Sequence, residues 1–312
     1  MMRRIKRAVL FLLLWAVALS SFAYAAERPD FKAKCSLTID FSYDDLPVAD
    51  AEFRLFRVGE ISKDFTLSLS GAYKKYPVVV DGLDDVQFQK AADTLEGYVT
   101  LDGHKPMKVV TTNRDGQAKV EKLSAGLYLM TGVPVKTDAG SYIVENQLII
   151  LPYAENTAEE WIYDLTITPK AEFVPVTTEP LKLQVIKIWD DKASGGIHRP
   201  KEVTVHLLRD GEKFETVVLN EATSWRHEWT DLDPAYNWSV TEDVPVDYTV
   251  TITLEGFRFI VTNTCKKPPP PTPTPPPIPQ TGQLWWPVPV LLLLGGCLVA
   301  MGLVWRKDED ET

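Results

Sequence analysis

Apolar and polar residues alternate along two long segments of the chain, which predicts two β-rich domains. In the first segment the apolar positions are rich in β-branched and aromatic residues, and Gly, Asp and Pro bound the runs. The strands expected there are Ser36–Phe41, Glu52–Val58, Lys108–Thr112, Gly126–Thr131, Gln147–Leu151 and Trp161–Thr168. Between them, residues 85–99 place apolar side chains at helical spacing, which predicts one amphipathic helix lying on a sheet.

The second segment predicts strands alone. Turn pairs at Asp190-Asp191, Asp210-Gly211, Asp233-Pro234 and Glu255-Gly256 recur at a spacing typical of a sandwich. The fold class predicted is therefore mainly all-β: two tandem antiparallel β-sandwich domains of immunoglobulin-like or prealbumin-like shape, the first with one helix. We expect the domains at 26–173 and 181–265, joined by a Pro- and Thr-containing linker at 174–180.

The two ends of the chain predict export. A basic stretch, an apolar run and the small-x-small site Ala23-Tyr24-Ala25 predict a signal peptide over 1–25. An uncleaved membrane anchor is the alternative, but the apolar run is short for a spanning helix. A second apolar segment at 284–305 is long enough to cross a bilayer as a transmembrane helix, and the charged tail 306–312 would then lie in the cytoplasm.

Residues 266–277 are mostly proline and predict an extended spacer, which with the two residues that follow would span roughly 40 Å at about 3.1 Å per residue. Ile278, Pro279, Gln280, Thr281 and Gly282 stand between this spacer and the apolar segment. The order of pentapeptide, apolar helix and charged tail resembles a sortase cell-wall sorting signal. The alternatives are a single-pass membrane protein, which needs no pentapeptide, and a lipid-anchored protein, which lacks such a charged tail.

That resemblance implies the surface of a Gram-positive bacterium, cleavage between Thr281 and Gly282, and covalent attachment of Thr281 to peptidoglycan by a sortase. Ile278 stands where the family's pattern has Leu, so the class of sortase stays open. The precursor would be held in the plasma membrane by its C-terminal helix until then.

Three polar residues occupy the inward phase of strands in the second domain. Lys187 shares a face with Leu183, Val185 and Trp189; Glu242 with Trp238 and Val240; Asn263 with Phe257, Phe259 and Val261. A lysine at a strand end can instead extend its ammonium to water. Burial of all three would favour a neutral amine and a protonated acid, which are the groups needed to join Lys187 to Asn263 as an amide with Glu242 as proton shuttle.

The second domain resembles the Cna protein B-type domain of Gram-positive surface proteins. The resemblance covers 181–264, in stretches quoted as they stand: Lys187-Ile188-Trp189-Asp190-Asp191, Arg199-Pro200, Val203 to Leu208, Asp210-Gly211, Leu219 to Ala222, Trp225, Val240 to Pro245, Tyr248 and Val261 to Thr264. It implies an isopeptide bond between Lys187 and Asn263, with Glu242 catalytic.

The first domain is similar, more loosely, to the SpaA-type pilin domain. The similarity lies in Pro47 to Phe53, Gly126 to Leu129 and Trp161 to Lys170, the last looking like a pilin motif with Thr168 in place of Tyr and Ala171 in place of Asn. It implies that Lys170 is the amine joined to Thr281 of another subunit. An ordinary solvated lysine at a strand end is the equal alternative.

Charge and composition exclude several classes. The formal charge is −10, and removal of the leader and of 282–312 would leave the mature chain near −12, which argues against nucleic acid as a partner. The four histidines are scattered without metal-ligand spacing, so no metal and no cofactor is expected. We find no residues for catalytic turnover and predict a protein that is not an enzyme beyond one autocatalytic bond.

The function predicted is a structural pilin or pilus-associated stalk, whose partners are sortase, peptidoglycan and other pilin subunits. The alternative is a wall-anchored monomeric adhesin that binds a host or bacterial surface ligand through its first domain.

Two absences are also predicted. Cys35 and Cys265, at opposite ends of two end-to-end sandwiches, should not pair within one chain because a disulfide needs Cα atoms within roughly 7 Å. The first domain should lack an isopeptide, because the strand registers put Phe41 at the lysine position and Gly132 at the acid position.

Overall fold

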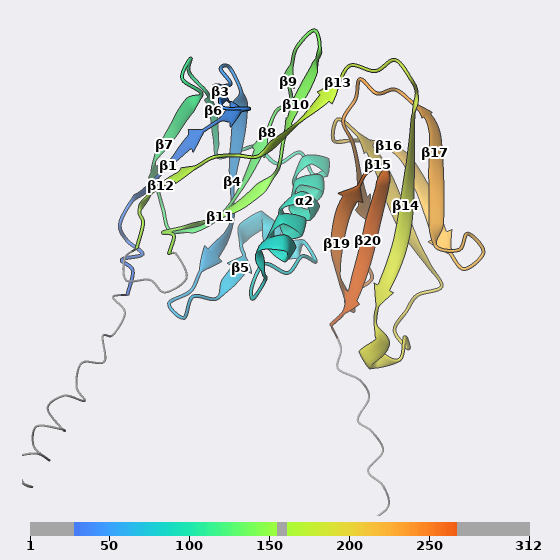
Figure 1. Cartoon of the computed structure of the whole chain (residues 1–312). Helices are drawn as coiled ribbons and strands as arrows, with labels where there is room; N and C mark the ends of the chain where they lie inside the picture. Colours follow the sequence, from blue (N-terminus) through green and yellow to red (C-terminus); the bar gives the residue numbers. More distant parts are fainter. Residues whose placement is uncertain (1–27, 155–160, 267–312) are drawn as a thin grey trace, which may run out of the picture. The chain divides into compact units, whose positions relative to one another are not determined.

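The computed structural model describes residues 28–154 and 161–266. They form two antiparallel β-sandwiches, each with the immunoglobulin-like arrangement of two sheets around an apolar core (Figure 1). Both sandwiches belong to one compact unit of the chain. The predicted signal peptide, proline-rich spacer beyond Lys266, sorting motif, transmembrane helix and charged tail lie outside the described residues and stay predictions.

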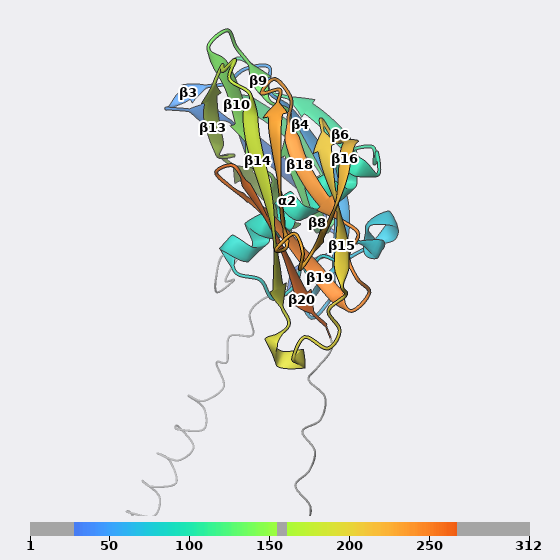
Figure 2. The ribbon, with the colours of Figure 1, turned by 90° about the vertical axis from the view of Figure 1, so that its right-hand side faces the viewer.

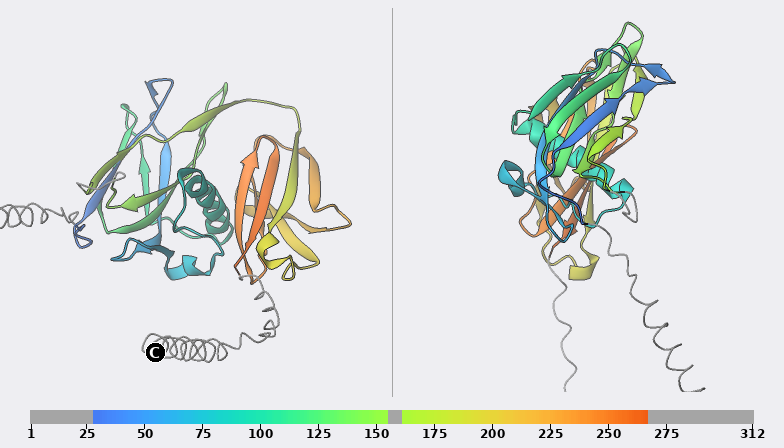
Figure 3. Two further views of the ribbon diagram at one scale, coloured as in Figure 1. Left: turned by 60° about the horizontal axis from the view of Figure 1, so that its bottom comes forward. Right: turned by 90° about the vertical axis from the view of Figure 1, so that its left-hand side faces the viewer.

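The first sandwich is built from two main sheets, one of order β12-β1-β7 and one of order β11-β8-β4-β5 with β6 beside β4. Two small sheets, β2-β3 and β13-β10-β9, extend it. The strands are β1 (Cys35–Asp40), β2 (Ser42–Tyr43), β3 (Leu46–Pro47), β4 (Glu52–Ile61), β5 (Leu67–Leu69), β6 (Lys108–Thr111), β7 (Gln117–Leu123), β8 (Gly126–Gly132), β9 (Val135–Lys136), β10 (Gly140–Val144), β11 (Gln147–Leu151), β12 (Asp164–Ile167) and β13 (Ala171–Pro175). The right-hand view of Figure 3 faces the sheet of β12, β1 and β7.

The helix α2 (Asp85–Leu101) begins at a capping box. The Asp84 carboxylate accepts from the Gln87 N–H, and the Gln87 side chain accepts from the Asp84 N–H. A 3-10 turn, η1 (Gly71–Lys75), precedes it. Ala91, Ala92 and Leu95 are buried on the apolar face, and the helix packs on β11 and β8 of its own sandwich and on β18 and β19 of the second.

The second sandwich has sheets of order β17-β14-β20-β19 and β16-β15-β18. Its strands are β14 (Leu181–Asp190), β15 (Glu202–Arg209), β16 (Glu212–Asn220), β17 (Arg226–Leu232), β18 (Trp238–Glu242), β19 (Tyr248–Glu255) and β20 (Arg258–Cys265), with a 3-10 turn η2 (Lys192–Ser194). Figure 2 turns this sandwich toward the viewer. In both sandwiches the first strand pairs in parallel with a strand near the C-terminal end of the domain, β1 with β12 and β14 with β20.

The predicted fold class is confirmed, and its details differ at named places. β12 begins at Asp164 and not at Trp161, because Ile162 makes only a single bridge with Tyr153 and the ladder with β1 starts at Asp164. β13 runs through Pro175 and pairs with β10, so the first sandwich extends two residues into the expected linker. Phe257 is 65% exposed, because it lies in the turn before β20 and outside the inward phase.

Several strands of the first sandwich were not among those predicted. β5, β9, β10 and β13 have only two to five residues each, which is too short for a pattern of alternation to be recognised. β7 is different: Ala118, Val120 and Leu123 are buried and the residues between them are exposed. Its alternation was readable in the sequence and was the signal that could have found it.

The two cysteines lie in different sandwiches. Cys35 begins β1 and is buried, and Cys265 ends β20. Among residues 28–154 and 161–266, no helix is both long and apolar enough to cross a membrane.

Truncation of Phe41 to Ala should destabilise the first sandwich by about 3–5 kcal/mol, because its ring is fully buried and packs edge-on at 5.6 Å from that of Phe53. Urea unfolding followed by a signal from the first sandwich measures the change. Phe65→Ala is the control, since Phe65 is 43% exposed in the same sandwich. Equal losses from the two substitutions would contradict the assignment of Phe41 to the core.

Candidate functional site

The three polar residues singled out from the sequence meet inside the second sandwich. Lys187 lies on β14, Glu242 is the last residue of β18 and Asn263 lies on β20. Alternation along each strand turns them inward with their apolar neighbours. The residues are 5%, 2% and 0% exposed respectively.

Strand pairing explains how the lysine and the asparagine come to face one acid. In the parallel β14–β20 pair, Lys187 is opposite Val261 and Trp189 is opposite Asn263, so Lys187 and Asn263 are diagonal neighbours on one face. Glu242 belongs to the other sheet, where it is opposite Val205. The carboxyl group therefore approaches the pair from across the core.

Lys187 and Asn263 both contact the carboxyl group of Glu242. The Asn263 Nδ2 donates to Glu242 Oε1 at 2.6 Å. The Lys187 Nζ is 3.4 Å from Oε2 and donates to the backbone carbonyls of Ile188 and Val261 at 3.1 and 3.2 Å. The Oε2 contact is an ion-pair distance without hydrogen-bond geometry, and Glu242 Oε2 and Asn263 Oδ1 have no hydrogen-bond partner.

Burial sets the charge state of the pair. Loss of hydration lowers the pKa of Lys187 to about 8, although the negative charge of Glu242 opposes that shift. The same burial raises the pKa of Glu242 above its ordinary value, against the opposing effect of Lys187. Both shifts favour the neutral amine and the protonated acid, and the two groups titrate as one coupled pair.

Trp189 forms one wall of the site. The Lys187 Nζ lies 4.4 Å from the centre of its ring and the Arg199 guanidinium 5.4 Å from it. The indole also packs edge-on against the rings of Trp225 and Tyr248. The buried amine is thus bounded by one aromatic ring, two backbone carbonyls and the Glu242 carboxyl group.

A second network closes the site beyond Trp189, and its roles were not foreseen from the sequence. The Asp191 carboxylate accepts two hydrogen bonds from Arg199, at 2.7 and 3.0 Å, and one from the Tyr248 hydroxyl at 3.1 Å. These bonds hold the pKa of Asp191 below its ordinary value and, with burial, raise that of Tyr248 to about 12. All three residues were within the stretches that carried the resemblance, which was the available signal.

The corresponding places in the first sandwich hold different chemistry. Phe41 is fully buried just after β1. Gly132 ends β8 opposite Phe53, and a Cβ added there would lie 2.7 Å from the side chain of Val144. Neither place offers an amine or an acid, so the absence of an isopeptide in this sandwich stays the prediction.

The remaining predicted site residues lie elsewhere. Lys170 is exposed between β12 and β13, where its carbonyl accepts from the Glu145 N–H, and it is not part of the buried cluster. Ile278 to Gly282 lie outside the described residues. Within the part of the chain that the structure describes, no group of three His, Cys, Asp or Glu side chains could hold a metal ion.

Comparison with known proteins finds a family match that lies within the second sandwich. Residues 183–264 match the family model of the Cna protein B-type domain. The collagen adhesin of Staphylococcus aureus is 31% identical over 165 residues, which are 48% of this chain and 13% of the adhesin. The chain thus spans only a small part of that relative's length.

Two solved structures illustrate the similarity. A single B repeat unit of the collagen-binding surface protein of Staphylococcus aureus is 17% identical, covering 75% of this chain and 99% of that one, with a TM-score of 0.27. The full-length major pilin SpaD of Corynebacterium diphtheriae is 15% identical, covering 76% and 65%, with a TM-score of 0.31. TM-scores this low carry no argument about function. Residues 183–264 of this chain are thus similar to the Cna protein B-type domain, and the buried Lys187, Glu242 and Asn263 all lie within that stretch.

Proposed function

We propose that this protein is a structural subunit of a Gram-positive cell surface, a pilin or pilus-associated stalk, stabilised by an isopeptide bond between Lys187 and Asn263. The observation that carries the proposal is the buried cluster in which both residues contact Glu242. Three buried polar side chains are a costly way to fill a core, and Glu242 Oε2 and Asn263 Oδ1 are still without a hydrogen-bond partner, so packing alone does not account for the cluster.

In the reaction we infer, the neutral Nζ of Lys187 attacks the side-chain carbonyl carbon of Asn263. Glu242 Oε1 accepts from Asn263 Nδ2 in the structure, and Asn263 Oδ1 has no hydrogen-bond partner there. Protonated Glu242 would polarise the carboxamide by donating a hydrogen bond to that free Oδ1. Glu242 then accepts a proton from the attacking nitrogen and returns one to Nδ2 as the carbon–nitrogen bond of the carboxamide breaks. A new amide and one molecule of ammonia result, and Glu242 ends as it began.

Such a bond would tie the first strand of the domain to its last. It closes a loop of 76 residue steps, from 187 to 263. By analogy with the loop entropy of a disulfide, the closure would add roughly 4–5 kcal/mol to the unfolding free energy. Because β14 and β20 are neighbours, force applied at the two ends of this domain would be borne by covalent bonds. That property suits a stalk.

Attachment to the wall rests on the C-terminal sequence. Thr281 would be joined by a sortase either to peptidoglycan or to an amine of another subunit. Lys170 is available for the second role, since its side chain is exposed and lies on the first sandwich. The proline-rich spacer would carry the domains through the wall.

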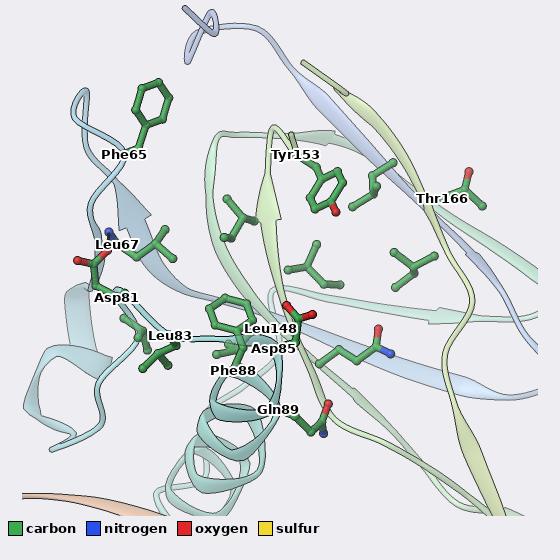
Figure 4. Close-up of a pocket in the computed structure, with 17 residues that line it drawn as sticks. Phe65, Leu67, Asp81, Leu83, Asp85, Phe88, Gln89, Leu148, Tyr153 and Thr166 are labelled. Carbon is green, nitrogen blue, oxygen red and sulfur yellow. Dashed lines mark hydrogen bonds between the residues drawn. The ribbon is translucent and has the colours of Figure 1, made fainter. Parts of the chain in front are cut away.

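A monomeric wall-anchored adhesin is the second candidate, favoured by one observation. The first sandwich has a cavity of about 660 Å³ lined by apolar side chains of β5, β11, β12 and the start of α2 (Figure 4). Phe65, Phe88 and Tyr153 contribute aromatic rings, and Asp81 and Asp85 contribute carboxylates. This volume is within the range of ligand sites.

The mature chain should be lighter than its sequence mass by one ammonia, about 17 Da, because the amide forms with its loss. Intact-mass measurement of wild type beside Lys187→Ala is the test, and the variant should keep its full mass. Glu242→Ala should fold, remain unlinked and unfold at a lower temperature. Full sequence mass in the wild type would end the proposal of a cross-link.

The rate of cross-linking should have a bell-shaped dependence on pH. In the reactive state Lys187 and Glu242 hold one proton between them, on Glu242. At low pH both groups are protonated, so the amine is not a nucleophile. At high pH Glu242 has lost the proton that polarises the amide. With the pKa of Lys187 near 8 and that of Glu242 raised, the rate should fall above about pH 8 and again toward the acid side. Intact-mass time courses between pH 4 and 10 measure it; a rate that still increases at pH 10 would exclude Glu242 as the acid.

Lys170→Ala should separate the pilin from the adhesin. If Lys170 is the acceptor of Thr281, wall extracts should give a high-molecular-weight ladder on denaturing gels, and the substitution should abolish it. Lys136→Ala is the control, because Lys136 is also an exposed lysine of the first sandwich. A single anchored band in all three strains would favour the monomeric adhesin.

A further inference from the structure

The second sandwich has an open side at which both of its sheets end. β18 is the edge strand of one sheet and β19 is the edge strand of the other. Unpaired backbone groups at such edges must be covered or hydrated. In this chain, helix α2 of the first sandwich packs on both strands.

The edge of β19 is bound by two groups of the first sandwich. The Val250 N–H donates to the Pro77 carbonyl at 2.9 Å, and the Ile252 N–H donates to Thr94 Oγ1 at 2.8 Å. The Thr94 hydroxyl itself donates to the Lys90 carbonyl within α2 at 2.7 Å and lies 3.3 Å from a second acceptor, the Ile252 carbonyl of β19. On the other side of β19, Val250 is paired with Asn263 of β20. The strand next to the cross-linking asparagine is therefore held from the first sandwich.

The edge of β18 is bound at the catalytic acid itself. The Asp243 N–H donates to Thr204 of β15, so the carbonyl of Glu242, which belongs to the same planar peptide, points away from β15. The Tyr98 hydroxyl of α2 donates to that carbonyl at 2.9 Å. Burial raises the pKa of Tyr98, so its hydroxyl stays a donor.

Packing brings the helix close enough for these bonds and keeps water out. A Cβ added at Gly97 would lie 3.3 Å from the methyl group of Thr241, which marks a close approach of α2 to β18. The buried apolar residues of α2 belong to the same continuous core as Val240, Val250 and Ile252. The side chains of Lys187 and Glu242 are 0% exposed.

We propose that α2 of the first sandwich is a positioning element for the cross-linking reaction of the second, with Tyr98 and Thr94 as its positioning residues. This inference rests on the proposed isopeptide. Tyr98 fixes the backbone of the acid, and Thr94 fixes the strand beside the asparagine, so the helix holds the two sheets at the separation that the reaction needs. The bond then forms after the two sandwiches have docked, and the first domain controls when the second is locked.

The test follows the loss of about 17 Da with time in freshly synthesised mature chain, by intact-mass measurement. Tyr98→Phe removes only the hydroxyl and should slow the loss roughly three- to tenfold. Tyr128→Phe is the matched control: Tyr128 is a buried tyrosine of the first sandwich whose hydroxyl also donates to a backbone carbonyl, that of Ser124. It should leave the rate unchanged.

Thr94→Val keeps the shape of the side chain, removes the acceptor for the Ile252 N–H and should also slow the reaction. Thr94→Ser keeps the oxygen and should restore the rate. Unfolding measured in a Lys187→Ala background, where no bond forms, establishes that each variant is folded when its rate is taken. If Tyr98→Phe does not fold, the Thr94 variants decide the test, and if Thr94→Val does not fold, Tyr98→Phe decides it.

The outcomes are distinct. If the wild type never loses ammonia, the proposed cross-link is wrong. If the wild type loses it and folded Tyr98→Phe and Thr94→Val lose it at the same rate, the cross-link stands and the role of α2 is wrong. The inference is supported if Tyr98→Phe and Thr94→Val both slow the loss of ammonia, Thr94→Ser restores the rate, and Tyr128→Phe leaves the rate unchanged.

Discussion

The burial of one amine beside one carboxyl group is the constraint on which the second sandwich depends. A charged Lys187 or a charged Glu242 in this apolar core would be costly on its own. Burial lowers the pKa of Lys187 and raises the pKa of Glu242, and the charge of each group opposes the shift in the other. The core can hold the pair only because they are adjacent, with Lys187 Nζ 3.4 Å from Glu242 Oε2 and Asn263 Nδ2 donating a hydrogen bond to Oε1 of the same acid. The aromatic wall of Trp189 and the Asp191–Arg199 ion pair then keep water from the amine.

The strand order places Lys187 and Asn263 on two neighbouring strands that lie at opposite ends of the domain's sequence. Parallel pairing of β14 with β20 makes the first and last strands of the domain neighbours, so a bond between them closes nearly the whole domain. The first sandwich has the same parallel pairing of β1 with β12 but fills its core with Phe41, Leu37 and Ile39. The same strand pairing thus encloses an apolar core in the first sandwich and a core with three polar side chains in the second. The difference lies in the inward-facing residues of a few strands.

Alternation along strands was enough to predict the buried triad, because period-two patterning assigns a face to each side chain without knowledge of the tertiary structure. It failed for Phe257, where the strand starts one residue later than its apolar run, and for β12, whose ladder begins only at Asp164. Tyr98 and Thr94 lie within the helix predicted over residues 85–99, and the helical pattern assigned neither of them a role at the site. Their partners are the backbone of Glu242 and Ile252, more than 140 residues away, and no local pattern encodes a bond to a distant carbonyl or N–H.

The expectation of two end-to-end sandwiches also omitted what an edge strand requires. β18 and β19 are both edge strands of their sheets, and Glu242 is the last residue of β18. Left uncovered, these edges would admit water to the carbonyl of Glu242 and loosen the separation of the sheets. That would reduce the burial that lowers the pKa of Lys187 and raises the pKa of Glu242. Helix α2 meets that requirement with bonds to both edges and an apolar face against the core. The first sandwich is therefore part of the chemical environment of the second, and the two sandwiches belong to one compact unit of the chain.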